Sequence, residues 1–400
     1  MRRIIFHIDV NNAFLSWSAV YRLSKGETLD IRTIPSVIGG DEASRRGVVL
    51  AKSNAAKKFG VVTGESIYTA KKKCPDLMVF PKNSDAYSYY SNEVIKIFQE
   101  YTDYIERYSI DESFLDVTAL AGKEPYRLAY EIKERIKKEL GFTVNVGISD
   151  NKILAKMASE FEKPDKIHTL YRSEIKEKLW PLPIEELFMV GKQATKRLKD
   201  MYIFTIGDLA NYDPSLLKQK FKSYGELIWK YANGLGEEEI NYQEEEAKVI
   251  SNELTLPKDV QSKTEAAEVL KELADKLGRR IRALNRYCTT IGVHIKTSEF
   301  INYSHQKKLK TATCSTAVIY NTALELFEKK WQYEPVRLLG ISLSGLCEEA
   351  IEQTSFFSDS GVGMIKEQKL DKVLDSLKDK YGDEIISKLS LREDKSGKRS

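Results

Sequence analysis

Cysteine is scarce in this sequence, and its few copies form no recognisable site. Cys74, Cys288, Cys314 and Cys347 lie far apart, with no CxxC pair and no histidine at ligand spacing. Neither a zinc site nor a disulfide framework is therefore indicated. We expect a protein of a reducing compartment, the cytoplasm.

Long hydrophobic runs are missing as well. The longest apolar runs are too short to span a bilayer, and the opening letters MRRIIFHIDV pass directly from two arginines into a strand. This pattern fits neither a signal peptide nor an anchor, so we expect no membrane partner. Hydrophobic residues still make up 42% of the 400 residues, which predicts a globular chain of roughly two to four domains.

The chain also lacks a large excess of either charge, since its formal net charge is only +4. Basic residues are nevertheless grouped at 57–73, 279–286 and 307–310, and the glutamates of 237–246 separate two of these groups. A single charge run is typical of a solvated face. Several basic regions divided by an acidic one favour modules that share one anionic ligand.

Strand and helix patterns alternate over the first 170 residues. Residues 3–9 predict a strand. The letters NNAFLSWSAVYRL predict a helix that begins at its own asparagine cap, and residues 30–80 predict a small inserted subdomain. Further helices and a hairpin indicate an α+β sheet with helices on one face. Short helices follow at about 180–235, then a Glu-rich stretch expected to repel itself and extend, then a second α+β unit.

The stretch RYSIDESFLDVT puts two carboxylates, Asp111 and Glu112, between two short half-buried strands. Adjacent anions repel each other, so the pair is either a solvated turn or a cation site. A third carboxylate, Asp9, ends the first predicted strand. If that strand neighbours the hairpin, the three acids share one sheet edge, an arrangement that suits phosphoryl transfer with two metal ions.

Four blocks, IIFHIDVNNAF, SDAYSYYSNEV, YTDYIERYSIDESFLDVT and NVGISDNKILAKMASEFEKPD, occur in this order. They resemble the Y-family DNA polymerases, the DinB/UmuC-type translesion enzymes, and the resemblance runs to about residue 348. It implies a multidomain right-hand fold with a ferredoxin-like palm at 1–28 and 81–173, fingers at 29–80 and a helical thumb at 174–235. A linker at 236–246, a little finger at 247–348 and a flexible tail at 349–400, with a clamp-binding peptide and a short helix at 370–381, complete this division.

The resemblance implies that Asp9, Asp111, Glu112 and the carbonyl of Val10 hold two Mg²⁺ ions. The implied activity is error-prone addition of deoxynucleotides to a primer 3′ end on template DNA.

The nucleotide site follows from the same resemblance. Phe14 occupies the position of the steric gate that excludes ribonucleotides, and Lys163 that of a triphosphate ligand. Asn54 and Lys57 stand where the family usually has a tyrosine and an arginine. Lys57 keeps the charge but loses the bidentate fork, and Asn54 can still donate a hydrogen bond. Asn11 replaces a frequent aspartate. Lys152 and Lys156 precede Lys163 on the same predicted helix, and their roles stay open between a solvated face and phosphate binding.

DNA contacts are expected from two regions. One resembles a helix-hairpin-helix, with Gly191, Lys192 and Lys196 near a phosphate, although Met189 replaces the usual first glycine of its turn. The other is the little finger, whose expected backbone contacts are Arg279, Arg280, Arg282, Arg286 and Lys296.

The polar tail contains EQTSFF, which resembles the peptide that bacterial replication factors insert into the sliding clamp. Gln353, Phe356 and Phe357 would be its anchors, the alternative being two rings that fold back onto the little finger. We expect a monomer that binds primer-template DNA, deoxynucleoside triphosphates and this clamp.

Two other classes of protein remain as alternatives. The string GGDEA, at 39–43, resembles the signature of diguanylate cyclases, but that motif belongs on the central hairpin, which Asp111 and Glu112 occupy. A non-catalytic DNA-binding paralogue would have no need to concentrate acids beside DNA phosphates. We therefore favour the polymerase.

Overall fold

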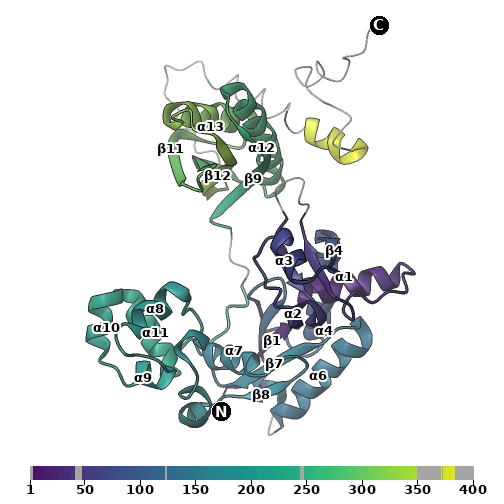
Figure 1. The fold of residues 1–400 in the computed structure, drawn as a ribbon, viewed down its shortest axis with the longest axis vertical. Helices are drawn as coiled ribbons and strands as arrows, with labels where there is room; N and C mark the ends of the chain where they lie inside the picture. The colour runs from purple at the N-terminus through teal and green to yellow at the C-terminus, as the bar shows by residue number, and fades with distance from the viewer. Residues whose placement is uncertain are drawn as a thin grey trace. The chain divides into compact units, whose positions relative to one another are not determined.

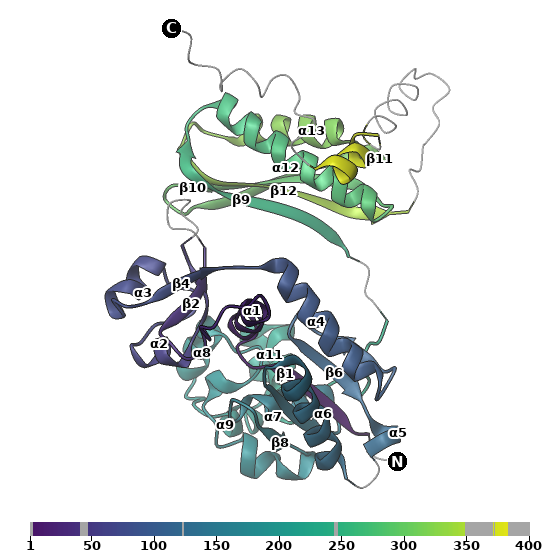
Figure 2. The same cartoon turned by 90° about the vertical axis from the view of Figure 1, so that its right-hand side faces the viewer.

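The computed structural model describes residues 3–40, 47–121, 124–243, 247–348, 371 and 373–382. The chain forms two compact units that meet in sequence at Glu244 and Glu245, and their elements are labelled in Figures 1 and 2. None of the helices in the described part of the chain combines the length and apolar character that a membrane span requires.

A five-stranded sheet with the order β5-β6-β1-β7-β8 forms the centre of the N-terminal unit. Its only parallel pair is β7 with β8. The strands are β1 (Ile5–Val10), β5 (Ile105–Arg107), β6 (Glu112–Asp116), β7 (Val144–Ser149) and β8 (Ile167–Thr169). The accompanying helices are α1 (Ala13–Ser24), α4 (Ser84–Gln99), α5 (Thr118–Ala121), α6 (Pro125–Leu140) and α7 (Lys152–Glu160).

Side chains of β1 alternate between the two faces of this sheet. Phe6, Ile8 and Val10 pack with residues of α1, α4 and α6 in one large core cluster. Ile5 instead packs with Phe114 and with Ala155 of α7. His7 and Asp9, two and four residues after Ile5, therefore belong to the face that α7 covers.

The expectation of helices on one face only is wrong, because α7 lies against the other face. Gly147 of β7 makes this close approach possible. A Cβ atom at this glycine would stand 1.9 Å from the carbonyl oxygen of Ala155 and 2.5 Å from the amide nitrogen of Ser159. The sheet thus accepts α7 in direct backbone contact, beside His7 and Asp9.

Residues 36–81 of the N-terminal unit contain a second, three-stranded sheet. It comprises β2 (Ser36–Gly39), β3 (Val49–Lys52) and β4 (Met78–Pro81) in the order β3-β2-β4, with α2 (Asn54–Lys58) and α3 (Ile67–Lys73). Asn12 precedes α1 in the left-handed conformation, and its side chain makes no cap hydrogen bond. Its amide instead donates to the carbonyl of Lys52 at 2.7 Å, so the predicted asparagine cap is replaced by a tie to β3.

Short helices fill residues 172–232 of the N-terminal unit. They are the turns η1 (Arg172–Glu174), η2 (Ile175–Leu179) and η3 (Ile184–Glu186), and the helices α8 (Lys192–Lys199), α9 (Ile206–Ala210), α10 (Pro214–Phe221) and α11 (Ser223–Ala232). Their apolar side chains share a core with Ile153, Leu154 and Met157 of α7.

The Glu-rich stretch after α11 does not extend by self-repulsion over its first residues, because each glutamate there meets a cation. Glu237 pairs with Lys152, Glu238 with Arg172, and Glu239 with Arg3. These pairs fasten the described start of the stretch to the N-terminal unit.

The C-terminal unit contains a four-stranded antiparallel sheet with the order β11-β10-β12-β9. Its elements are β9 (Val249–Val260), α12 (Lys263–Ala283), β10 (Tyr287–Thr297), β11 (Asn302–Thr313), α13 (Thr316–Lys330) and β12 (Val336–Cys347). Both long helices cover the same face of the sheet (Figure 2) and share its core with Ile291, Val293 and Ile295. Residues 371 and 373–381 are helical as well.

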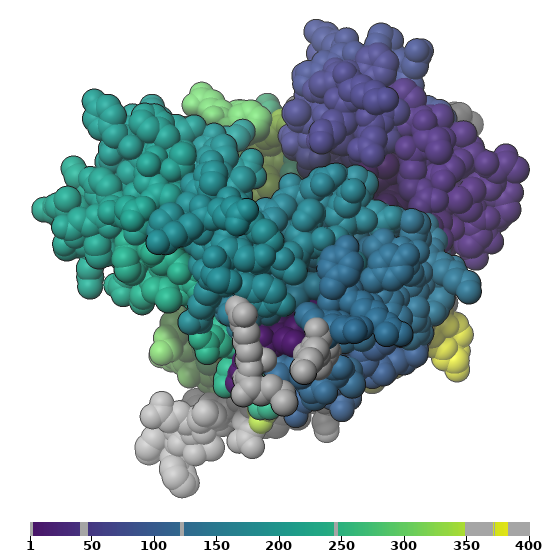
Figure 3. Space-filling model, turned by 90° about the horizontal axis from the view of Figure 1, so that it is seen from below, coloured from purple at the N-terminus to yellow at the C-terminus, as the bar shows by residue number. Residues whose placement is uncertain are grey.

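A cavity of about 710 Å³ opens in the N-terminal unit near Arg3, Tyr104, Thr118 and Tyr242. Figure 3 shows the N-terminal strand, in purple, at the bottom of a hollow in this unit. Arg3 and Thr118 adjoin the start of β1, whereas Asp9 lies near the other end of that strand. Four residues along a strand span about 13 Å, so this cavity is separate from the carboxylates.

Candidate active site

Asp9 and Glu112 face each other across two neighbouring strands. The antiparallel register of β1 and β6 pairs Asp9 with Glu112 and His7 with Phe114. Directly opposite residues of an antiparallel pair lie on the same face, with Cβ atoms about 4.5–5.5 Å apart. The sheet therefore holds these two carboxylates side by side, on the face that α7 covers.

A third carboxylate comes from Glu160, the last residue of α7. One oxygen from each of Asp9, Glu112 and Glu160 lies within 4.8 Å of the other two. The sequence did not single out Glu160, although helical spacing gave a signal. It lies four residues after Lys156 and three before Lys163, so these three side chains share one side of the segment.

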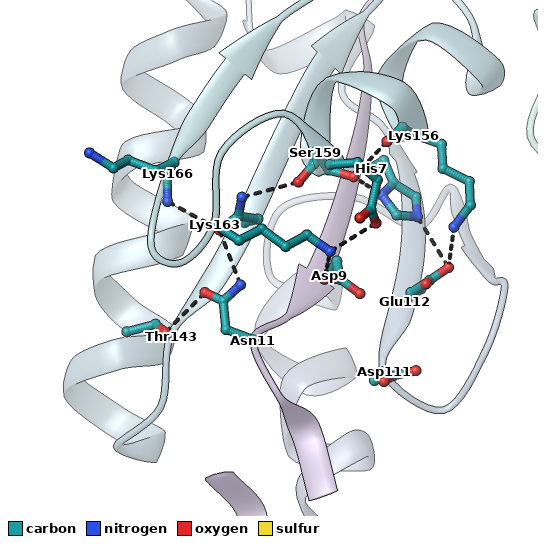
Figure 4. A network of polar contacts seen from close by, with 12 residues as sticks. His7, Asp9, Asn11, Asp111, Glu112, Thr143, Lys156, Ser159, Lys163 and Lys166 are labelled. Carbon is teal, nitrogen blue, oxygen red and sulfur yellow. Dashed lines mark hydrogen bonds and ion pairs between the residues drawn. The ribbon is translucent and has the colours of Figure 1, made fainter. Parts of the chain in front are cut away.

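Asp111 is not a member of this group of oxygens within the described residues. Its carboxylate accepts a hydrogen bond from Ser109 Oγ at 2.6 Å, and its carbonyl accepts one from the Val10 amide at 3.0 Å. Figure 4 shows Asp111 on the hairpin, apart from the network around Glu112. The predicted role of Asp111 as a metal ligand, and that of the Val10 carbonyl, stay predictions.

Two lysines pair with the clustered acids, and Figure 4 shows both of them beside Asp9 and Glu112. Lys163 Nζ lies 2.7 Å from Asp9 Oδ2 and 2.8 Å from Glu160 Oε1. Lys156 Nζ lies 2.5 Å from Glu112 Oε2 and stands over the rings of Tyr108 and Phe188. Lys156 is buried, so it does not belong to a solvated face, and phosphate binding by Lys156 stays a prediction.

The surroundings act differently on the two facing carboxyl groups. Burial raises the pKa of Asp9 to about 6 against the opposing charge of Lys163. Burial also acts to raise the pKa of Glu112, but His7 and the Lys156 ammonium outweigh it and lower that pKa to about 2. Glu112 is thus firmly ionised, whereas Asp9 is held ionised only weakly by its neighbours.

The donor set fits a divalent cation. Clustered carboxylate oxygens are the ligands of hard ions such as Mg²⁺ and Mn²⁺. Asp9 is buried, Glu112 half-buried and Glu160 exposed, and acids at this spacing gain from a cation that relieves their repulsion. The residues do not by themselves select one of these ions.

Phe14 lies in the first turn of α1 and is partly buried. Its ring stacks on Tyr87 of α4 with centroids 4.8 Å apart and an interplanar angle of 20°. Asn54 and Lys57 lie on α2, where both are exposed. Asn11 is buried, and its amide donates to Asn145 Oδ1 at 3.1 Å. An aspartate at position 11 could not make that donation.

The predicted DNA contacts of the short-helix segment gather at the start of α8. Gly191 precedes the helix, Lys192 is its first residue, and Lys196 lies one turn later; all three are exposed. Met189 has φ of 73°, in the left-handed region that favours glycine. This backbone conformation explains why a glycine is usual at that position.

The structure does not bring the five predicted contacts of the C-terminal unit together. Lys296 lies on β10, next to the inward-facing Ile295, and so points to the face away from the helices. Arg279, Arg280 and Arg282 belong to α12, in the helical layer. The Arg282 side chain is only 5% exposed and pairs with Asp371 and Asp375. Arg282 is therefore not among the DNA contacts that we propose below.

Arg286 pairs with Glu348 at 2.8 Å. Gln353, Phe356 and Phe357, the predicted clamp-binding residues, lie outside the described residues.

Comparisons with known proteins agree with this arrangement. The impB/mucB/samB family matches residues 8–160, and the C-terminal domain of the same family matches residues 247–356. A protein named DNA polymerase IV from Clostridium acetobutylicum is 54% identical over 98% of this chain and 99% of its own length. DNA polymerase IV of Acetivibrio thermocellus is 37% identical over 96% of both chains.

Among solved structures, a Y-family DNA polymerase chimera of Dbh and Dpo4 matches with a TM-score of 0.75. It covers 86% of this chain and 100% of its own, at 23% identity, so it supports the fold alone. The predicted α+β multidomain class is confirmed. From the two family matches and the identity to full-length relatives, the chain belongs to the impB/mucB/samB family and is a DNA-directed DNA polymerase of the translesion Y-family.

Proposed function

We propose that this chain adds deoxynucleotides to a primer 3′ end with two Mg²⁺ ions held by Asp9 and Glu112, with Asp111 and the Val10 carbonyl completing the ligands. The observation that carries the proposal is the pairing of Asp9 with Glu112 across β1 and β6, with Glu160 beside them. When bound, such ions activate the attacking oxygen and neutralise charge on the leaving phosphate.

The chain's own residues supply orientation and charge. Lys163, 32% exposed at its side chain and within 2.7 Å of Asp9, can bind a triphosphate oxygen at the edge of the carboxylate group. Asn54 and Lys57 would reach the triphosphate from α2, where their exposure leaves them accessible. Lys57 offers a point charge in place of an arginine fork.

Phe14 is proposed as the gate against ribonucleotides. Stacking on Tyr87 holds its ring in one orientation, and a fixed ring beside the sugar leaves no room for a 2′-hydroxyl. The partial burial of Phe14 supports this reading, because a ring wholly inside the core could not touch a substrate.

DNA would be held by its phosphates. We propose the start of α8, with Gly191, Lys192 and Lys196, as one contact. Lys296 on the open face of the C-terminal sheet would supply further charge. Arg279, Arg280 and Arg286 are kept as proposed contacts, but Arg279 and Arg280 belong to α12 on the other face and could not bind the same phosphates as Lys296. Binding through phosphates does not depend on the DNA sequence, and it weakens as the salt concentration rises.

We assign the five-stranded sheet to the palm, the three-stranded sheet to the fingers, the short helices to the thumb and the C-terminal unit to the little finger. Clamp binding by Gln353, Phe356 and Phe357, a monomeric state and a cytoplasmic location complete the proposal.

Primer extension by single variants tests the metal ligands. Asp9→Asn and Glu112→Gln should each lower the rate by about 10³-fold, because several kcal/mol of charge stabilisation depend on the ions. Binding to primed DNA, measured by fluorescence anisotropy, should stay unchanged. Glu124→Gln is the matched control. Glu124 is an exposed acid, and its partner Arg127 is 3.5 Å away. Normal extension by either of the first two variants would refute the site.

Asp111→Asn and Glu160→Gln, measured in the same assay, decide which of these two acids is the third ligand. A loss comparable to that of Asp9→Asn identifies the ligand, and a loss under about tenfold identifies a neighbour that acts on Lys163 or on the hairpin.

A further inference from the structure

His7 lies on β1 two residues before Asp9, with its side chain inside the protein. It is fully buried, and its ring packs against Phe114 with centroids 4.6 Å apart. Nδ1 lies 2.7 Å from Ser159 Oγ, and Nε2 lies 3.5 Å from Glu112 Oε2. The period of two along a strand placed His7 on the same face as Asp9, a signal that sequence reasoning had available and did not use.

Each ring nitrogen of His7 therefore faces a residue of the site, Ser159 at Nδ1 and Glu112 at Nε2. Ser159 belongs to α7, which Gly147 admits against the sheet, so the position of Nδ1 is fixed by backbone packing. Nε2 has no hydrogen-bond partner within normal distance among the described residues, and the group that it faces is the Glu112 carboxylate. The separation of 3.5 Å is an electrostatic contact slightly longer than a hydrogen bond.

The contact with Glu112 favours one tautomer of the ring. A bare Nε2 lone pair would face the carboxylate oxygen and be repelled, whereas an Nε2–H would be attracted. Nδ1 then accepts from the Ser159 hydroxyl. In the structure that hydroxyl is placed to donate to the Lys156 carbonyl at 2.8 Å. It must turn from this carbonyl to donate to Nδ1, and the carbonyl then keeps its partner within the helix.

We propose that His7 is a positioning residue for Glu112, with Ser159 holding Nδ1 and with Nε2–H aimed at Glu112 Oε2. The inference rests on the metal site proposed above. The Lys156 ammonium pairs with the same Oε2, but its flexible side chain can follow the carboxylate when it moves. The His7 ring is held between Ser159 and Phe114, so it fixes the orientation of the carboxylate. Both contacts fall on Oε2, so Oε1 is presented to a cation.

Manganese affinity of the full chain without DNA tests this proposal, with free Mn²⁺ followed by electron paramagnetic resonance. His7→Phe keeps a buried ring and removes both nitrogens, and it should weaken Mn²⁺ binding by about 10–100-fold, as loss of partners that orient metal ligands does. His7→Gln, which retains a donor, should lose less. In primer extension the His7→Phe defect should shrink as the metal concentration rises.

Glu112→Gln separates the two proposals. If this variant binds Mn²⁺ as the parent does, the metal site itself is wrong. If Glu112→Gln loses affinity and His7→Phe does not, the metal site stands and His7 is an ordinary core residue.

The tautomer gives a readout that needs no variant of His7. The chain has four histidines, so ¹⁵N spectra of the labelled parent can be assigned by replacing the other three with glutamine. A proton on Nε2 of His7 is expected. A proton on Nδ1 would overturn the proposal even if His7→Phe failed to fold.

Discussion

The buried arginine of the C-terminal unit predicts a large loss of stability when its carboxylate partner is removed. Arg282 Nε and Nη2 donate to the two oxygens of Asp375 at 2.6 and 2.9 Å. Its Nη1 reaches Asp371 Oδ2 at 3.2 Å and the Cys314 carbonyl at 2.9 Å. Asp375→Asn keeps the shape of the side chain but removes the charge and one of the two acceptors.

The expected cost follows from burial. Breaking a fully buried ion pair costs about 3–5 kcal/mol, because one charge is left without compensation. Here the Asp375 side chain is 20% exposed, and Asp371 remains next to the guanidinium. We therefore expect Asp375→Asn to lower the unfolding free energy of the C-terminal unit by about 2 kcal/mol.

Urea unfolding of the full chain, followed by hydrogen exchange of peptides from α12 and β12, measures this unit separately. Asp379→Asn is the matched control. Asp379 pairs with Arg279, is 71% exposed, and should cost less than about 0.5 kcal/mol when replaced. In an Arg282→Met background the Asp375→Asn penalty should vanish, because no buried cation is left. A penalty within 0.5 kcal/mol of that control, or one unchanged by Arg282→Met, would refute the reasoning.

Three further predictions concern catalysis and tethering. Phe14→Ala should raise ribonucleotide incorporation relative to deoxynucleotide by at least about tenfold, measured by single-nucleotide kinetics; an unchanged ratio would place the gate elsewhere. Lys163→Met should raise the KM for nucleotides by about 10–100-fold, the value of one charge-assisted hydrogen bond, and a KM equal to that of the parent would exclude a triphosphate contact. Replacing Phe356 and Phe357 together by Ala should abolish stimulation by the sliding clamp but leave distributive synthesis unchanged; equal stimulation of both proteins would exclude this peptide.

The local sequence was sufficient to place the first carboxylate and its strand. The end of the first predicted strand put Asp9 at a sheet edge, and the hairpin signal predicted Asp111 and Glu112 near it. The choice between Asp111 and Glu112 as the partner of Asp9 needed the register of β1 against β6, and a shift of one residue would exchange them. Register depends on packing along the whole pair, which no single stretch of sequence reports.

Burial of charge was the least predictable feature, because it depends on contacts between distant segments. Arg282 read as one member of a basic run, yet its partners lie 89 and 93 residues later, in the helix that contains Asp371 and Asp375. For Lys156 the sequence left a solvated face and phosphate binding both open. Its burial arises from Phe188 and Tyr108, which reach it from other parts of the unit.

The two lysines of the site differ in how much their side chains can move, and we expect them to act differently for that reason. Lys156 is boxed between two rings, with its side chain 9% exposed, so its charge stays beside Glu112. Lys163 is 32% exposed and shared between Asp9 and Glu160, so it can pass from a carboxylate to a phosphate oxygen with little rearrangement of the core. Such an exchange would free Asp9 when a nucleotide binds, while Glu112 keeps its counter-charge. The different ionisation of the two carboxyl groups has another cause: burial dominates at Asp9 despite Lys163, whereas His7 and Lys156 together outweigh burial at Glu112.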